Sequence, residues 1–308
     1  MPLTNYPNGV TSFGIPVVPL PLSAPPHGVV FWVNSATGTD GPSYGDAPNH
    51  AFATIKYALT RCSSGRGDVI IAANGHSETI TAADHWPGIV ASVTIVGQGV
   101  GLQRPTITWG TATTAQIVVD TYYNSFYNLI FNMNGIDAVA AGFSITGGSA
   151  RFTNCKFLLG TAAAEAVLGV SIGTGGDDCR FVNCEFVGAT TSGTTAAINT
   201  AVAIDGLVVD SCYFNANFGT AAINNATNAM TNARIVNNHA IILGAGKFLV
   251  AHASATGVVI GNHSLITANI AAGGSMTAAA MLKSQNYAQE AAGVASSTVV
   301  DPAAVAIT

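Results

Sequence analysis

The chain has 308 residues, enough for one large core or two modest ones. Charged side chains make up only 8% of it, against roughly 25% in typical soluble domains. The net charge is −5 and no basic run is present, so nucleic acid and anionic membranes are poor partners. The mean hydropathy is +0.41, yet no segment reaches the ~18 consecutive apolar residues of a membrane-spanning helix. So few charges indicate that much surface is buried against other chains.

The first 32 residues contain seven of the twelve prolines and no charged side chain. Proline excludes a helix here, and the segment lacks the alternation of a strand. We therefore expect an extended arm, apolar enough to lie on another surface. It also lacks the positive and apolar regions of a signal peptide. The residues that we expect to bind a partner are Tyr6, Pro7, Phe13, Ile15, Pro16, Val17 and Val18.

A helix is predicted at residues 52–62, after a loop rich in Gly, Asp and Pro. Phe52, Ile55, Leu59 and Cys62 fall at helical spacing. The stretch that follows, "GDVIIAANG", is predicted to be a strand. A short amphipathic helix in front of such strands is expected to close the end of the structure that they build.

An internal repeat dominates the middle of the chain. The pattern Arg-Phe-x-Asn-Cys-x-Phe occurs at Arg151 and again at Arg180, and its Asn position recurs every 24–29 residues. The residues in that position are Asn128, Asn154, Asn183, Ser211, Asn237 and Gly261. Short strands at this interval predict a single right-handed parallel β-helix of seven to nine coils over residues 33–270.

The columns of the repeat predict which side chains stack. Two positions before the Asn stand Phe126, Phe152, Phe181, Val209, Ile235 and Val259, and three positions after it stand Phe131, Phe157, Phe186 and Phe214. We expect these residues to fill the coil interior, since equivalent positions lie one strand spacing apart. Asn suits a sharp corner because it tolerates the left-handed backbone conformation.

The five cysteines, at positions 62, 155, 179, 184 and 212, form no C-x-x-C pair. Three of them follow the Asn position directly, which predicts buried thiols in the coil interior rather than disulfides or a metal site. We predict no metal and no cofactor. Beyond residue 270 the repeat stops, and residues 271–308 are expected to be a C-terminal cap or tail with an Ala-rich helix over 277–291.

One outward face turns apolar along the axis. Its residues are Val182, Val208, Val236, Val258 and Ile260, and Arg151, Arg180 and Arg234 share a column with two of them. An apolar outer face implies that something covers it, and we predict a homotrimer of parallel solenoids.

Few residues suggest catalysis. Asp177, Asp178 and Asp205 fall on neighbouring coils, near enough for the paired carboxylates of a retaining glycosidase. The same residues fit ordinary turns in which Asp side chains bond to nearby backbone. His239 and His263 also stack, and a surface pair is the simpler interpretation because no carboxylate joins them in register.

The start of the β-helix resembles right-handed β-helices of the pectin-lyase-like class. The matching residues are Gly38, Asp40, Phe52, Thr54, Ile55, Ala58, Gly67, Asp68 and Ile70. The Pro-Gly-x-Tyr expected after the first strand is replaced by "ANGHSETI". This resemblance covers about residues 33–265 and implies the fold alone, since that fold hosts lyases, hydrolases, adhesins and phage spikes. The stretch "NYPNGVTSFG" is similar to N-terminal segments of phage head and decoration proteins.

Together these features predict a non-enzymatic phage virion protein. We expect a trimeric capsid decoration protein or short head spike on the capsid exterior, assembled in the host cytoplasm, with residues 1–32 bound to the major capsid protein. One alternative is a tailspike-like polysaccharide lyase or glycosidase acting through Asp177, Asp178 and Asp205. Another is an adhesin that binds a host-surface glycan.

Overall fold

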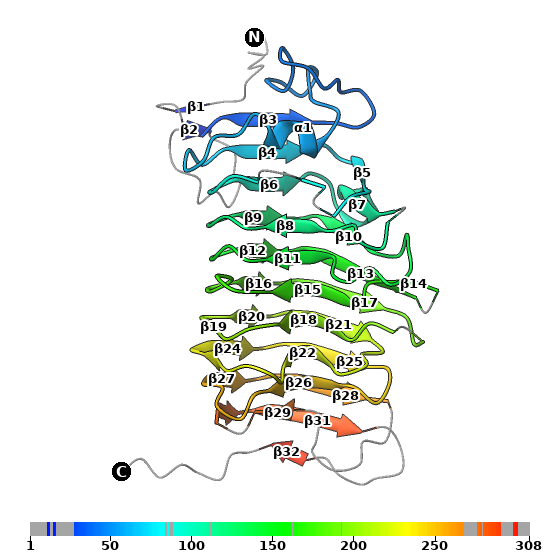
Figure 1. Cartoon of the computed structure of the whole chain (residues 1–308), viewed down its shortest axis with the longest axis vertical. Helices are drawn as coiled ribbons and strands as arrows, with labels where there is room; N and C mark the ends of the chain where they lie inside the picture. Colours follow the sequence, from blue (N-terminus) through cyan, green and yellow to red (C-terminus); the bar gives the residue numbers. More distant parts are fainter. Residues whose placement is uncertain are drawn as a thin grey trace, which may run out of the picture.

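The chain forms an elongated parallel β-helix of about eight turns, which confirms the predicted fold (Figure 1). A computed structural model describes residues 11–12, 15–16, 28–83, 85–86, 89–110, 112–161, 163–191, 193–267, 276–278, 280–290 and 298–300. No helix in these ranges is long and apolar enough to cross a bilayer.

Three sheets run along the axis, and each full coil visits them in the same order. The first sheet contains β3 (Val30–Val33), β4 (Val69–Ala72), β6 (Thr94–Gly97), β9 (Ser125–Tyr127), β12 (Arg151–Thr153), β16 (Arg180–Val182), β20 (Val208–Asp210), β24 (Ala233–Val236), β27 (Gly257–Ile260) and β30 (Leu282–Ser284). The second contains β5 (Ser77–Ile80), β7 (Thr106–Trp109), β10 (Ile130–Asn132), β13 (Lys156–Thr161), β17 (Glu185–Gly188), β21 (Tyr213–Ala216), β25 (His239–Ile242), β28 (His263–Ile266), β31 (Asn286–Glu290) and β32 (Thr298–Val300), with β14 (Ala164–Glu165) beside β13. The third contains β8 (Ile117–Val119), β11 (Phe143–Ile145), β15 (Leu168–Ile172), β18 (Ala196–Thr200), β22 (Ala221–Asn225), β26 (Lys247–Ala251) and β29 (Met276–Thr277).

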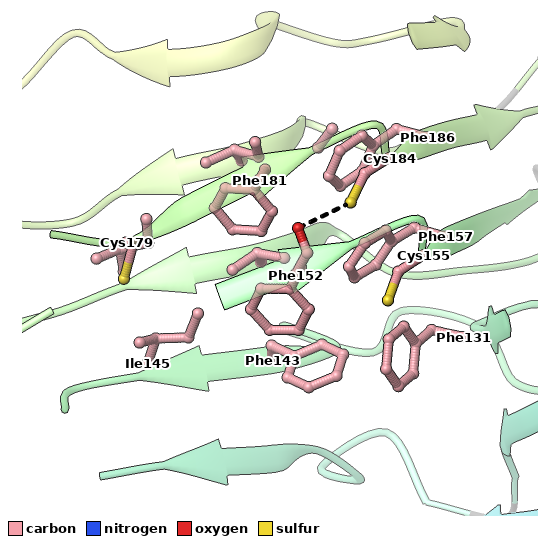
Figure 2. Close-up of a cluster of buried hydrophobic side chains, with 14 of the residues drawn as sticks. Phe131, Phe143, Ile145, Phe152, Cys155, Phe157, Cys179, Phe181, Cys184 and Phe186 are labelled. Carbon is pink, nitrogen blue, oxygen red and sulfur yellow. Dashed lines mark hydrogen bonds between the residues drawn. The ribbon is translucent and has the colours of Figure 1, made fainter. Parts of the chain in front are cut away.

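The repeated sequence pattern sets the register between coils. β12 pairs with β16 so that Phe152 lies opposite Phe181, and their rings stack at 5.1 Å with an interplanar angle of 3°. In the next sheet, Phe157 stacks on Phe186 at 4.5 Å. Figure 2 shows these rings in the coil interior, where all four are fully buried. Because like residues occupy like positions, each coil presents the shape that packs against the next.

The repeated Asn forms the corner between the first and second sheets. Asn128, Asn154 and Asn183 have φ values of 56°, 54° and 52°, in the left-handed region. Asn154 Nδ2 also donates to Asn128 Oδ1 at 2.9 Å, one coil away. Ser211, Asn237 and Gly261 share this conformation, so the predicted corner is confirmed through all six positions.

The predicted N-terminal helix exists but is shorter than residues 52–62. α1 spans Ile55–Leu59, with Ile55, Ala58 and Leu59 buried against the first coils. Thr54 begins it as N-cap, since its hydroxyl accepts from the Tyr57 N–H at 3.0 Å. Phe52 pairs with Val33 in a bridge before the helix. The Ser-Ser-Gly run after Cys62 disfavours further helix.

The predicted C-terminal helix over 277–291 is wrong. That stretch contains β29, β30 and β31, which pair in parallel with β26, β27 and β28. Gln285 takes the corner conformation at φ 53°, and the buried Asn286 follows it. Pairing with the preceding coil and a row of buried Asn side chains override the helix propensity of its alanines.

The N-terminal arm is described only in part. Thr11–Ser12 (β1) and Ile15–Pro16 (β2) pair as antiparallel strands. Of the residues predicted to bind a partner, Ile15 and Pro16 lie in β2. Tyr6, Pro7, Phe13, Val17 and Val18 lie outside the described residues.

Candidate functional site

The three candidate aspartates lie together at the corner where the third sheet leads into the first. This corner also uses the left-handed conformation, with Tyr123, Ser149, Asp178 and Asn232 at φ 64°, 60°, 57° and 53°. The Asp178 N–H donates to the Asp205 carbonyl at 2.8 Å, so the two residues lie on adjacent coils, as the repeat predicts. The structure therefore brings Asp177, Asp178 and Asp205 onto one exposed edge.

The carboxylates of this corner bond to neighbouring turns. Asp177 Oδ1 accepts the Asp205 N–H at 2.8 Å. Asp205 Oδ1 accepts the Thr231 hydroxyl and, at 2.8 Å, Asn232 Nδ2. These donors hold the pKa of Asp205 below its usual range. A glycosidase acid needs a raised pKa, which the bonded Asp205 does not have. The geometry thus favours turn chemistry for Asp205.

A second polar cluster is buried at the N-terminal end, and the sequence prediction missed the carboxylate at its centre. Glu78 points into the first coils from β5, opposite Ile107 of β7. Its carboxylate accepts the Ile55 N–H at 2.6 Å, the Lys56 N–H at 3.2 Å and Trp86 Nε1 at 2.8 Å. The only sequence signal is the alternation in "SETI", which places Glu78 on the same face as Ile80.

Two histidines also face this carboxylate. His76 Nε2 lies 3.5 Å and His85 Nε2 lies 3.6 Å from its oxygens, and His76 Nε2 has no hydrogen-bond partner. Burial raises the pKa of Glu78, but the imidazoles, Trp86 and the α1 backbone lower it more, to about 2. The cluster therefore holds a buried negative charge against the start of α1.

This donor set does not fit a metal ion. His76 Nδ1 accepts the Ser35 N–H at 3.0 Å and His85 Nδ1 accepts the Thr81 N–H at 3.3 Å. With Nδ1 as acceptor, each neutral ring carries its proton on Nε2, the atom that faces Glu78. The described residues contain no group of three or more His, Cys, Asp or Glu arranged for a metal. The cluster holds the start of α1 against the first coils through the Glu78 carboxylate.

The predicted histidine pair is part of a longer row on the outer face of the second sheet. His239 lies opposite Tyr213 and His263, and His263 lies opposite Tyr287. The rings of Tyr213 and His239 stack at 5.7 Å, and those of His263 and Tyr287 meet at 5.0 Å. The first pair is stacked at an interplanar angle of 20° and the second is tilted at 59°, so these imidazoles pack against tyrosine rings of neighbouring coils.

The stacked cysteines act as interior packing. Cys155, Cys184 and Cys212 each donate a thiol hydrogen bond at 3.4 Å to a backbone carbonyl of the preceding coil, that of Phe126, Phe152 and Phe181 respectively. The bond from Cys184 is drawn in Figure 2. Burial raises the pKa of Cys184 well above that of a free thiol. The Cys184 thiol is therefore neutral and unreactive.

The residues predicted to form a trimer interface lie on the outer face of the first sheet. Val182, Val208, Val258 and Ile260 are partly exposed there, while Val236 is buried. Farther toward the N-terminus, the outer residues Val69, Ile71 and Val96 form an apolar cluster of their own, with Val30, Trp32 and Tyr127 packed around it.

Comparison with known proteins adds little to this geometry. No family model matches the chain, and neither does any curated protein. Among solved structures, a rhamnogalacturonan lyase is similar over 85% of this chain and 74% of its own, with 12% identity and a TM-score of 0.40. A likeness at this level carries no argument about activity. The described coils themselves define the class of the fold, a parallel β-solenoid.

Proposed function

We propose that this chain is a structural phage virion protein, a trimeric capsid decoration protein or short head spike. The N-terminal arm, with its prolines and without a charged side chain, is the observation that carries this proposal. Such a segment suits a preformed apolar groove on a capsid lattice, because its prolines restrict the backbone before binding and so reduce the chain entropy lost on binding.

The β-helix supports the same function. Its coils bury a continuous apolar interior with few charges outside, which suits a rigid particle component more than a free monomer. The three aspartates lie on an exposed edge, and the hydrogen-bonded Asp205 lacks the raised pKa of a catalytic acid.

Deletion of residues 1–30 tests the arm. The truncated chain should keep the β-sheet circular dichroism of the full chain but lose its binding to capsids assembled from the major capsid protein. A double substitution within the arm, Phe13→Ser with Val17→Ser, should weaken binding, and the matched double change Val100→Ser with Leu102→Ser, at exposed residues outside the arm, should not. If the truncated chain still coats capsids, the arm is not the anchor.

The enzyme alternative rests on a single observation, the adjacency of Asp177 and Asp205 on neighbouring coils. A screen against bacterial surface polysaccharides, with Asp205→Asn as the control, decides between the two functions. We expect no cleavage by either protein. Cleavage that disappears in the Asp205→Asn variant would replace the structural proposal with a glycosidase or lyase.

A further inference from the structure

The corner between the third and first sheets combines tyrosines and arginines, two kinds of side chain enriched at protein interfaces, with carboxylates of opposite charge to the arginines. Tyr122 and Tyr123 lie at one level of this corner and are 55% and 60% exposed. One to four coils farther along lie the arginines of the outer column and the three aspartates. No other corner in the described part of the chain carries two exposed tyrosines.

Tyr123 occupies a backbone conformation that suits small residues. Its φ is 64°, and the equivalent corner positions on later coils are Ser149, Asp178, Gly206 and Asn232. A bulky aromatic residue in the left-handed region is strained, by about 1 kcal/mol or more. Strain of this kind, on a ring that folding leaves exposed, points to a role outside the folded monomer.

The arginines show a second departure from what folding favours. Arg151 lies directly opposite Arg180 on adjacent strands, and like charges in that position repel. Within the described part of the chain, no ion pair includes Arg151, Arg180 or Arg234. Arg151 Nε is buried and has no hydrogen-bond partner. The outward carboxylate nearest them on the first sheet, Asp210, accepts the Ser211 hydroxyl instead.

The opposite charge lies beside these arginines, at the same height along the axis. Asp177 and Asp178 directly precede β16, which begins at Arg180, and Asp205 precedes β20. Arg151 is one coil before Arg180 and Arg234 is two coils after it. The three arginines and the three aspartates therefore lie on overlapping coils. The arginines lie on the first sheet beside the corner, and the aspartates lie in the corner itself.

We propose that three copies of this chain meet along this corner, with Arg151, Arg180 and Arg234 of each copy against Asp177, Asp178 and Asp205 of the next. In a cyclic trimer whose axis runs along the solenoid, equivalent coils lie at one height. The arginines on the first sheet of each copy then face the corner aspartates of its neighbour, so opposite charges meet at all three contacts. Tyr122 and Tyr123 pack near the axis. This inference rests on the trimer of the proposed function and specifies its interface.

Charge reversal tests the arrangement in the full chain, with mass measured by sedimentation equilibrium. Arg180→Glu should raise the dissociation constant of the trimer at least tenfold, and adding Asp178→Lys to the same chain should restore it. Arg61→Glu, the same charge change on an exposed residue away from the corner, should leave the mass unchanged. The trimer of the unaltered chain should weaken as salt is raised.

Tyr123→Asn adds a readout of opposite sign. Asn relieves the strain at φ 64°, so the thermal midpoint of the dissociated chain should rise while the trimer weakens. A monomeric unaltered chain would overturn both the proposed trimer and this interface. A trimer that survives Arg180→Glu unchanged would overturn the interface alone. So would Arg180→Glu trimers that have lost capsid or glycan binding, because the arginines would then serve another ligand.

Discussion

The strongest single prediction concerns Glu78, the carboxylate buried behind the capping helix. Replacing it with Gln keeps the size of the side chain but removes the charge that the Ile55 and Lys56 N–H groups, Trp86 Nε1 and two imidazoles surround. The amide also brings an NH2 group toward those donors. The first turn of α1 then loses its partner, and the N-terminal end of the solenoid should loosen.

The pKa of Glu78 sets the size of the effect. Its folded value is lowered from 4.5 to about 2, and each unit corresponds to roughly 1.4 kcal/mol, so the ionised carboxylate stabilises the fold by about 3 kcal/mol. Because the folded pKa is the lower one, this stabilisation is fully present above pH 4.5. It is lost as the pH falls from 4.5 toward 2.

Urea unfolding followed by circular dichroism, at fixed protein concentration between pH 7 and pH 2.5, measures this contribution. Glu78→Gln should lower the free energy of unfolding by about 3 kcal/mol at pH 7, and the difference from the unaltered chain should shrink below pH 4.5. The matched control is Glu185→Gln, which breaks a partly exposed ion pair with Lys156 and should change stability by at most about 1 kcal/mol. A difference that stays constant from pH 7 to pH 2.5 would refute the electrostatic reasoning.

Three further predictions concern the interior stacks. Phe181→Ala should destabilise the chain by about 3–5 kcal/mol in the same urea assay, since it removes a fully buried ring between neighbouring coils. Asn262→Ala removes the oxygen that accepts from the Asn238 N–H at 3.0 Å and from Asn238 Nδ2 at 2.8 Å, and should lower stability by roughly 1–3 kcal/mol, whereas a loss near zero would mean that water replaces the amide. Cys184, whose pKa is raised by burial, should resist a thiol reagent at pH 8 in the native chain and react only in denaturant, as timed by mass spectrometry.

The sequence determines the repeat most strongly because three independent demands coincide at each coil. The corner needs a residue that accepts positive φ, the next position needs a small buried side chain, and the flanking positions need large apolar ones. Asn154, Cys155 and Phe157 satisfy all three, and Asn183, Cys184 and Phe186 repeat them. Because all three requirements are met at the same positions of successive repeats, they specify both the fold and its register.

The last coil escaped prediction because its signal is chemically different. Gln285 replaces Asn at the corner, and Asn286 continues a row with Asn238 and Asn262 where earlier coils have cysteine. Asn262 Nδ2 donates to Asn286 Oδ1 at 2.9 Å in the coil interior. Alanine-rich flanks have a strong local preference for helix, and only pairing with a preceding coil reveals the alternative.

The polar clusters were harder to predict than the core. Asp177 and Asp205 fall on adjacent coils as the repeat predicts, but their hydrogen bonds and the lowered pKa of Asp205 depend on Thr231 and Asn232, one coil further on. Glu78 occurs once, without an equivalent on later coils, so no periodicity marks it. A lone buried charge is specified by the three-dimensional arrangement of its donors, which a single sequence does not display.

The final strand has a consequence for end-to-end pairing through the second sheet. β32 runs antiparallel to β31, whereas the coils before it pair in parallel. A second molecule placed end to end would have to add a strand parallel to the last strand of the second sheet. The reversed β32 presents the hydrogen-bonding pattern of an antiparallel pair instead. At the opposite end α1 packs against β3 and β4. The reversed β32 therefore disfavours end-to-end growth through the second sheet.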